Sequence, residues 1–398
     1  MGSSRRVSVF RDGGLEKLGF EYVPSRLPHR EGYVDALIEY LKTVIDHPGV
    51  FSERILITGG SGTGKTVTAK KVGSALEEIA ERRGVDLVYA HVNCRATSGK
   101  FGLVQRIIQK AASELPLRGY GATELLHALW DYLNERNKLL VLTLDEIDYY
   151  IRTTGEDIVY ELSRLTNSLQ DVPQRLNFVF IARDHSFMDV LSPDTLSKLR
   201  PQERMDFPPY REDELRNILE ERVTVAFQEG AVSNEIINYI ARNAVEYGHG
   251  DARYGIQLLC VAGLIADRDF NSHVLAEHVR EAQDRSDPKL SDEDVMMLSM
   301  EEKYVLWGLA RCLKWSKDEV FLSLDEVEKE YYSVCEEEDR KSVGRAMLHA
   351  LVQKMKAAGV IVVTEDFRLG LDVRAEVLDR FLTDLFKKKE KKHYDKAR

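Results

Sequence analysis

The residues with the clearest chemical potential lie in one short stretch, ILITGGSGTGKTVTAKK, at positions 55–71. This stretch satisfies the pattern G-x-x-x-x-G-K-[ST], in which glycines accept the positive φ angles that turn successive N–H groups onto phosphate oxygens. The lysine of such a loop reaches the terminal phosphates of a nucleotide, and the next hydroxyl is a ligand for Mg²⁺. We therefore predict that ATP or ADP binds here with Mg²⁺, through Lys65 and Thr66. The full predicted loop comprises Gly59, Gly60, Ser61, Gly62, Thr63, Gly64, Lys65, Thr66 and Val67.

A second motif, LLVLTLDEID at 139–148, follows the lysine by about eighty residues. An apolar strand that ends in an Asp-Glu pair is typical of the metal side of such a site. We expect Asp145 to hold Mg²⁺ and Glu146 to polarise the attacking water. Because a small-molecule kinase needs no water-activating carboxylate, the pair favours nucleotide hydrolysis.

The elements that must position these residues follow from the apolar pattern. Four short apolar runs, RILIT, DLVYAHVN, LLVLTLD and NFVFIA, lack a clean period of two, which is typical of strands buried on both faces of a parallel sheet. Helical stretches alternate with them, so we predict an α/β nucleotide-binding core over residues 1–206. Residues 207–290 read as amphipathic helices and form a predicted helical lid, which ends in the polar linker SDPKLSDE.

The last third, residues 291–398, has the order helix–helix–helix–hairpin, which predicts a winged helix. Its third helical segment, RKSVGRAMLHALVQKMKAAG, has five basic and no acidic residues between Arg340 and Val363. We expect this segment to enter the major groove of duplex DNA, and the hairpin VIVVTEDFRLGLDV to be the wing. The predicted DNA contacts are Lys341, Ser342, Arg345 and His349 on the helix and Arg368 on the wing. A winged helix that serves protein contacts instead remains an alternative, and Glu365 and Asp366 beside the wing arginine disfavour a phosphate contact there.

Composition limits the classes that remain. The chain has 398 residues, which is too many for one ordinary core, and its 43% hydrophobic content is that of a folded protein. It lacks an apolar run long enough to span a membrane, and its four cysteines are scattered, so we expect a cytoplasmic protein. The net charge of −10 belongs to residues 1–300, because residues 301–398 carry 20 basic and 20 acidic side chains. Any polyanionic partner should therefore meet the C-terminal third.

Several further stretches resemble a known family. HGDARYGIQLL, at 249–259, resembles the sensor 2 helix of AAA+ ATPases, and the chain as a whole is similar to the archaeal origin-recognition and replication-licensing initiators. In YVPSRLPHREGYVDAL, Pro28, His29 and Arg30 match the family segment that wraps the adenine. Residues 91–125 match the second strand and a helical insertion of this family, part of which touches DNA, and the LPLRGY turn within them contributes Arg118. MDFPPYREDEL, at 205–215, matches the junction between core and lid.

This resemblance implies an ATP-dependent replication initiator that binds duplex origin DNA and uses slow, Mg²⁺-dependent ATP hydrolysis as a switch. It implies that Arg253 contacts the γ-phosphate as a catalytic and sensing residue. Its implied partners are origin DNA, the replicative helicase and related initiator subunits, with no membrane; we expect a monomer in solution, and multimers on DNA are an open alternative. The chain departs from the family at Arg183, where an Asn is usual, and DTLSKLRP offers no plain arginine finger.

Two other functions remain open on the sequence alone. One is a signal-transduction NTPase whose winged helix contacts proteins, and the other is a clamp-loader-like AAA+ remodeller. The Gly-Asp-Ala-Arg stretch and the basic third helix disfavour the first, and the absence of a plain arginine finger disfavours the second.

Overall fold

The computed structural model describes residues 8–97, 99–167, 173–286, 290 and 292–394. These residues form two compact units: residues 21–214 with 248–252, and the remainder of the chain. Half of the predicted linker SDPKLSDE, and the end of the basic tail, lie outside the described residues. Within the described residues, none of the helices is long and apolar enough to cross a membrane.

The first unit is built on a parallel sheet of five strands in the order β2-β3-β4-β1-β5. All seven residues of β3 and all six of β4 are buried, which explains why these strands read as continuous apolar runs. The strands are β1 (Arg54–Gly59), β2 (Leu87–Asn93), β3 (Leu139–Asp145), β4 (Leu176–Ile181) and β5 (Glu203–Phe207). The predicted α/β core is confirmed, and β5 is an additional edge strand.

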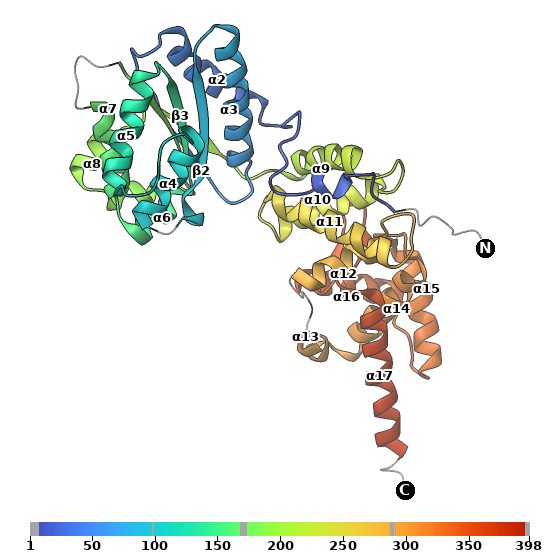
Figure 1. Cartoon of the computed structure of the whole chain (residues 1–398). Helices are drawn as coiled ribbons and strands as arrows, with labels where there is room; N and C mark the ends of the chain where they lie inside the picture. Colours follow the sequence, from blue (N-terminus) through green and yellow to red (C-terminus); the bar gives the residue numbers. More distant parts are fainter. Residues whose placement is uncertain (1–7, 98, 168–172, 287–289, 291, 395–398) are drawn as a thin grey trace. The chain divides into compact units, whose positions relative to one another are not determined.

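Helices cover both faces of this sheet (Figure 1). Successive residues of β1 point to opposite faces, so that Ile55 and Ile57 join one apolar cluster while Leu56 joins the other. One face packs on α2 (Glu31–Asp46) and α3 (Lys65–Arg82). The other face carries α4 (Gly99–Ala111), α5 (Ala122–Glu135), α6 (Ile147–Thr154), α7 (Asp157–Asn167) and α8 (Pro193–Leu199), with the short η1 (Cys94–Ala96) and η2 (His185–Val190). β1 is an interior strand, between β4 and the edge strand β5, and its C-terminal end leads into α3.

The second unit contains the helical lid and the winged helix. The lid helices are α9 (Glu212–Ala226), α10 (Asn234–Glu246), α11 (Ala252–Arg268) and α12 (Ala276–Ser286). Residues 8–20, with α1 (Gly14–Lys17), join this unit rather than the nucleotide-binding core. Phe10 packs on Phe227 with ring centroids 4.7 Å apart, and Arg11 Nε donates to the Phe227 carbonyl at 2.5 Å.

The C-terminal part of the second unit has the predicted winged-helix order. Its elements are α13 (Asp292–Met297), α14 (Met300–Trp315), β6 (Leu322–Ser323), α15 (Leu324–Glu337), α16 (Arg345–Ala357), β7 (Val362–Val363), β8 (Arg368–Gly370) and α17 (Ala375–Tyr394). The strands form an antiparallel sheet in the order β6-β8-β7, so the predicted hairpin is confirmed and β6 is additional. Leu348, Leu351, Val352 and Met355 are buried and fix α16 on the core of this domain, as their helical spacing predicts.

Polar side chains hold the lid to the winged helix inside the second unit. Arg280 of α12 is fully buried and donates Nε to the Leu371 carbonyl at 3.0 Å and Nη2 to the Val320 carbonyl at 3.1 Å. Asp372 is buried opposite α10 and accepts from Arg242 at 2.8 Å. Buried charges that are fully paired fix geometry, because breaking one pair leaves an uncompensated charge. The lid and the winged helix are thus joined by a specific polar contact.

Candidate nucleotide-binding site and nucleic-acid interface

The glycine-rich loop connects the central strand β1 to α3. Gly64, the N-cap of α3, has φ 94°, and Gly62 has φ 62°, so both residues use the left-handed region that glycine tolerates. A Cβ on Gly64 would lie 2.5 Å from the Tyr210 hydroxyl, and one on Gly62 would overlap the Asp251 carboxylate. Both the backbone angle and the available space therefore require glycine at these two positions.

Lys65 begins α3, and its ammonium lies along the loop. Lys65 Nζ donates to the carbonyl oxygens of Gly59 and Gly60, at 2.6 Å each. The Thr63 hydroxyl donates to the Gly60 carbonyl at 3.1 Å and closes the turn. The cation is consequently held at the loop whose N–H groups are predicted to bind phosphate, which fits the predicted role of Lys65.

The two predicted metal ligands meet at the carboxyl edge of the sheet. Thr66 Oγ1 donates to Asp145 Oδ2 at 2.7 Å, although the two residues are 79 apart in sequence. Asp145 is the last residue of β3, which pairs with β4, and β4 in turn pairs with β1. Its side chain is buried. A hydroxyl and a carboxylate are oxygen ligands of the kind Mg²⁺ prefers, with phosphate and water oxygens as the others. These residues therefore fit a magnesium ion, and their role as its ligands stays a prediction.

A histidine that the sequence did not reveal supports Asp145. His91 Nε2 lies 3.2 Å from Asp145 Oδ2, and its Nδ1 lies 3.2 Å from the Tyr89 hydroxyl, which in turn accepts from Thr143 at 3.0 Å. Burial alone would raise the pKa of Asp145, but the hydrogen bonds from His91 and Thr66 hold it below its ordinary value. No short motif marks His91, because β2 and β3 pair only through the parallel register of the sheet.

Glu146 follows Asp145 in an unusual backbone conformation. Its φ of 56° is left-handed, and its carboxylate is half-buried between two residues from the end of β2. Asn93 Nδ2 lies 3.5 Å from Glu146 Oε1, and Arg95 Nη1 lies 3.6 Å from Glu146 Oε2. The predicted base is therefore oriented by Asn93 and Arg95, two residues that sequence reasoning missed.

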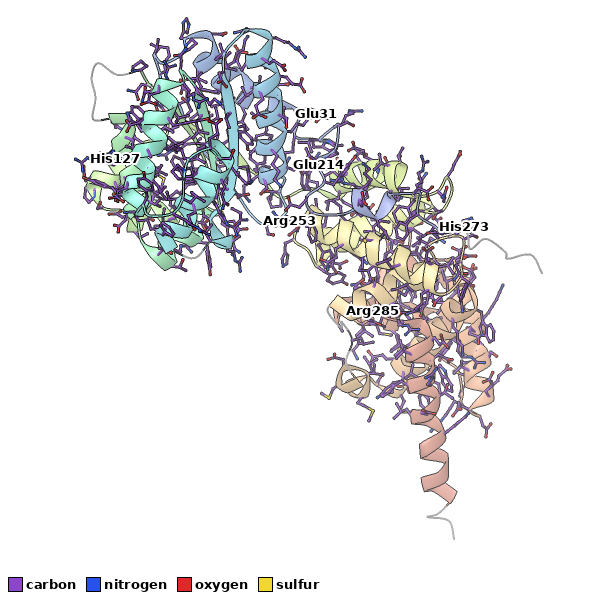
Figure 2. The ribbon with its side chains drawn as sticks, viewed as in Figure 1. Glu31, His127, Glu214, Arg253, His273 and Arg285 are labelled. Carbon is purple, nitrogen blue, oxygen red and sulfur yellow. The ribbon has the colours of Figure 1, made fainter. Side chains whose placement is uncertain are left out.

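The segment HGDAR meets the glycine loop through Asp251. Ser61 Oγ donates to Asp251 Oδ2 at 2.8 Å, and the Ala252 N–H donates to the Gly62 carbonyl at 3.2 Å. Arg253 comes next, exposed in the first turn of α11 (Figure 2). Because Arg253 belongs to the second unit, its predicted contact with the γ-phosphate stays a prediction.

The PHR segment lies beside the same loop. Arg30 is only 2% exposed, donates Nε to the Thr63 carbonyl at 2.9 Å and Nη2 to the Pro208 carbonyl at 2.7 Å, and lies 3.9 Å from the centroid of the Tyr210 ring. His29 has φ 63° and lies 3.8 Å from Glu214, whereas Pro28 precedes it with partial exposure. Arg30 thus orients the loop itself, and the predicted adenine contact of Pro28, His29 and Arg30 stays untested.

At the position where an Asn was expected, Arg183 presents its backbone to the loop. Its carbonyl accepts from the Gly59 N–H at 3.0 Å, whereas its side chain is exposed. Next to it, His185 Nε2 lies 3.1 Å from Asp206 Oδ1, which also accepts from the Thr58 hydroxyl. The strand end is therefore tied to its neighbours by polar contacts that the sequence did not suggest.

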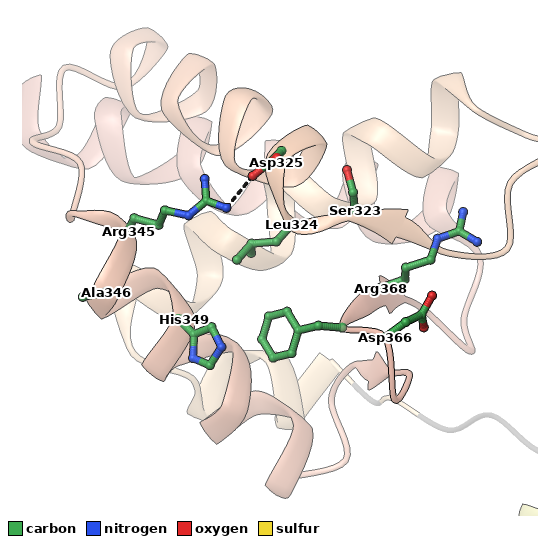
Figure 3. Close-up of a pocket in the computed structure, with 9 residues that line it drawn as sticks. Ser323, Leu324, Asp325, Arg345, Ala346, His349, Asp366 and Arg368 are labelled. Carbon is green, nitrogen blue, oxygen red and sulfur yellow. Dashed lines mark hydrogen bonds and ion pairs between the residues drawn. The ribbon is translucent and has the colours of Figure 1, made fainter.

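Three of the five predicted DNA-binding residues of the winged helix line one open groove (Figure 3). Its cavity volume is about 660 Å³, and its walls are the first turns of α16, the hairpin β7–β8, and the end of β6 with the start of α15. His349 of α16 stacks on Phe367 of the hairpin, with centroids 4.3 Å apart and planes 1° from parallel. Figure 3 shows Arg345 and Arg368 on opposite sides of this groove. The structure thus brings Arg345, His349 and Arg368 to one surface.

The other predicted DNA contacts lie elsewhere. Because Gly344 is the N-cap and α16 begins at Arg345, Lys341 and Ser342 precede the helix and do not continue its face as the sequence predicted. Arg118 is exposed in the turn between α4 and α5, in the first unit. Gly344 explains why the helix begins later than predicted, because glycine favours a helix boundary over a helix interior.

Comparisons with known proteins agree with this architecture. The chain matches the family models described as AAA domain over residues 53–191, Cdc6 AAA+ ATPase-type lid domain over 216–284, and CDC6, C terminal winged helix domain over 293–371. These matches define the class: an AAA+ ATPase core with a Cdc6-type lid and winged helix.

Relatives then narrow the class. The chain is 33% identical over 346 residues to the ORC1-type DNA replication protein 2 of Sulfolobus acidocaldarius, covering 86% of this chain and 83% of the relative. Among solved structures, Cdc6p from Pyrobaculum aerophilum has a TM-score of 0.82 at 24% identity and covers 96% of this chain and 100% of that one. The Aeropyrum pernix ORC1 protein in complex with DNA has a TM-score of 0.61 at 27% identity, with 93% and 96% covered. The chain belongs to the family of ORC1-type DNA replication proteins.

Proposed function

We propose that this chain is an ATP-switched replication initiator that binds duplex origin DNA through its winged helix and its AAA+ core. The observation that carries the proposal is that Lys65, Thr66 and Asp145 meet at the glycine-rich loop, in a chain that also carries a winged-helix groove lined by Arg345, His349 and Arg368. The family relative solved in complex with DNA supports duplex DNA as the ligand.

Each residue of the nucleotide site has a separate role in the proposed hydrolysis. Bound ATP with Mg²⁺ supplies the reactive terminal phosphate. Lys65 and the loop N–H groups bind the phosphates, Thr66 and Asp145 hold the metal, and Glu146 accepts a proton from the attacking water. Hydrolysis is slow, because a state that decays quickly cannot mark a site. Arg253 senses the terminal phosphate from the lid.

The DNA part of the proposal concerns the groove of the winged helix. Arg345, His349 and Arg368 face the duplex there, Lys341 and Ser342 contact the backbone before the helix, and Arg118 adds a contact from the core. Related initiator subunits and the replicative helicase are the partners that the family membership suggests, and a cytoplasmic, nucleoid-associated location follows from that role.

Changing Arg345 to Ala tests the groove. We expect weaker binding to a duplex selected by the wild-type protein from a randomised pool, and a plot of log affinity against log salt that is shallower by about one phosphate contact. Fluorescence anisotropy across a KCl series measures both. Changing Arg216, an exposed arginine of α9, to Ala is the matched control and should leave both unchanged. If no duplex binds the wild-type protein, the winged helix serves protein contacts and the signal-transduction alternative stands.

A further inference from the structure

Arg345, the first residue of the helix α16, is held by two carboxylates of the neighbouring helix α15. Its Nη1 donates to Glu328 Oε2 at 2.8 Å, and its Nη2 donates to Asp325 Oδ1 at 2.5 Å. Figure 3 shows the arginine turned toward Asp325 at the edge of the groove. The guanidinium that the proposed function turns toward DNA therefore already has two anionic partners.

The same arrangement recurs at two other cations of this domain. Lys354 Nζ lies 2.9 Å from Glu302 Oε1, and Arg368 Nη2 lies 3.3 Å from Glu319 Oε2. In each case the carboxylate comes from outside α16 and the hairpin, from α14 or from the segment before β6. Of these three cations, Arg345 is the one that two acids contact.

Burial holds one of the two acids, Glu328, in place. The side chain of Glu328 is 11% exposed and also accepts from the Tyr332 hydroxyl at 2.7 Å, whereas the side chain of Arg345 is 61% exposed. The exposed arginine side chain can change its rotamer, whereas the nearly buried glutamate keeps its position. A phosphate that approaches Arg345 therefore meets a fixed negative charge from Glu328 and a second, exposed negative charge from Asp325.

This geometry affects two kinds of binding differently. Non-specific binding to DNA comes almost entirely from pairing Lys and Arg with phosphates. Its affinity therefore falls when a cation must leave a carboxylate to pair with a phosphate. A base edge with two adjacent acceptors binds a guanidinium well when the direction of that guanidinium is already fixed. The carboxylates that hold the arginine thus lower the affinity for duplexes of arbitrary sequence more than the affinity for a matching duplex.

We propose that Asp325 and Glu328 are specificity-determining residues, which hold Arg345 against α15 and suppress phosphate-driven binding to arbitrary duplexes. The inference rests on the proposed function, because it refines the same groove. It predicts that removing the two carboxylates makes the protein a tighter and less selective DNA binder.

The test uses the full chain with the double change Asp325→Asn and Glu328→Gln, which keeps the hydrogen-bonding shapes and removes both charges. Two probes are used: a random-sequence duplex, and the duplex that the wild-type protein selects from a randomised pool. We expect binding to the random duplex to tighten roughly three- to tenfold at low salt, with a salt slope steeper by about one phosphate contact. Binding to the selected duplex should improve less, so the ratio of the two affinities should fall.

Two further variants separate the arrangement from general charge and from misfolding. The double change Glu376→Gln and Asp384→Asn removes the same charge from α17 and should leave the affinity ratio as in the wild-type protein. Asp325→Asn alone, at an exposed carboxylate, should show part of the effect without disturbing the core. Adding Arg345→Ala to the first double variant should abolish its gain.

The outcomes are distinct. If the α17 variant loses selectivity as much as the α15 variant, net charge explains the effect and the inference is overturned. If the wild-type protein selects a duplex but the α15 variant shows the same affinities and slopes, this inference alone is wrong. If the wild-type protein binds neither probe at any salt concentration, the proposed function and the inference both fall.

Discussion

At the scale of single residues, Glu146 has the most constrained geometry of the nucleotide site. A residue other than glycine with φ 56° is uncommon and is retained where the surrounding structure requires it. Here the turn presents the carboxylate to Asn93 and Arg95 at the end of β2. The carboxylate is therefore positioned by two side chains and partly exposed, which fits its proposed role as a base.

Changing Glu146 to Gln tests that role. The amide retains the shape and the contact with Asn93 but cannot accept a proton, so we expect phosphate release to slow by roughly 10²- to 10⁴-fold while ATP affinity is unchanged. Phosphate release and nucleotide binding are measured separately on the same preparation. Glu135→Gln, at an exposed position that ends α5, is the matched control. Equal loss of binding and of turnover would contradict the role of Glu146 as a base.

The sequence predicted some residues of this site and not others, for a physical reason. The loop glycines, Lys65 and Asp145 stand in motifs whose spacing is local, because each sits where one strand ends. His91, Asn93 and Asp251 reach the site through strand register and through a loop that returns from far along the chain. Neither of these contacts has a local signature, so only the folded chain reveals them.

At the scale of elements, the strands predicted for the parallel sheet are those that form largely apolar runs, β1 to β4. The edge strand β5 alternates exposed charged residues with buried ones, and β6 has only two residues, so neither resembles a continuous apolar run. The start of α16 was also placed too early, because basic residues continue before its cap at Gly344. Patterns of apolar residues find the middle of a fold more reliably than its edges.

The contact between the lid and the winged helix should make the stability of the protein depend on pH. Asp284 of α12 accepts from the Arg374 N–H at 3.4 Å, and burial raises the pKa of its carboxyl from 3.8 to about 6. The folded state therefore binds this proton more tightly than the unfolded chain does. The stability from this group is complete below about pH 4 and is lost as the pH rises through about 6.

Changing Asp284 to Asn removes this titration. We expect the variant to gain about 1 kcal/mol of unfolding free energy relative to the wild-type protein as the pH rises from about 4 to about 7, a value reduced for solvent screening of a half-exposed group. Urea unfolding at several pH values measures the difference. Asp384→Asn, at an exposed carboxylate of α17, should track the wild-type protein at every pH. A constant difference between the Asp284 variant and the wild-type protein would show that ionisation of Asp284 is not involved.

At the scale of the whole molecule, the nucleotide site and the DNA groove belong to different compact units. Within the second unit, Arg280 and Asp372 fix the winged helix to the lid, so whatever moves the lid also moves the groove. Arg253 lies at the start of a lid helix, directly after the segment that contacts the glycine loop. The proposed switch requires that Arg253 sense the terminal phosphate and that the lid pass this signal to the winged helix through these contacts.

The most direct test of this account compares two nucleotides on one protein. The Glu146→Gln chain, which should retain ATP without hydrolysing it, is loaded with ATP or with ADP, and its dissociation constant for the selected duplex is measured by anisotropy alongside a footprint. We predict binding about tenfold tighter with ATP, within the usual range of coupling between two sites, and no nucleotide effect after the additional change Lys65→Ala. Identical dissociation constants and identical footprints with the two nucleotides would contradict the proposed switch.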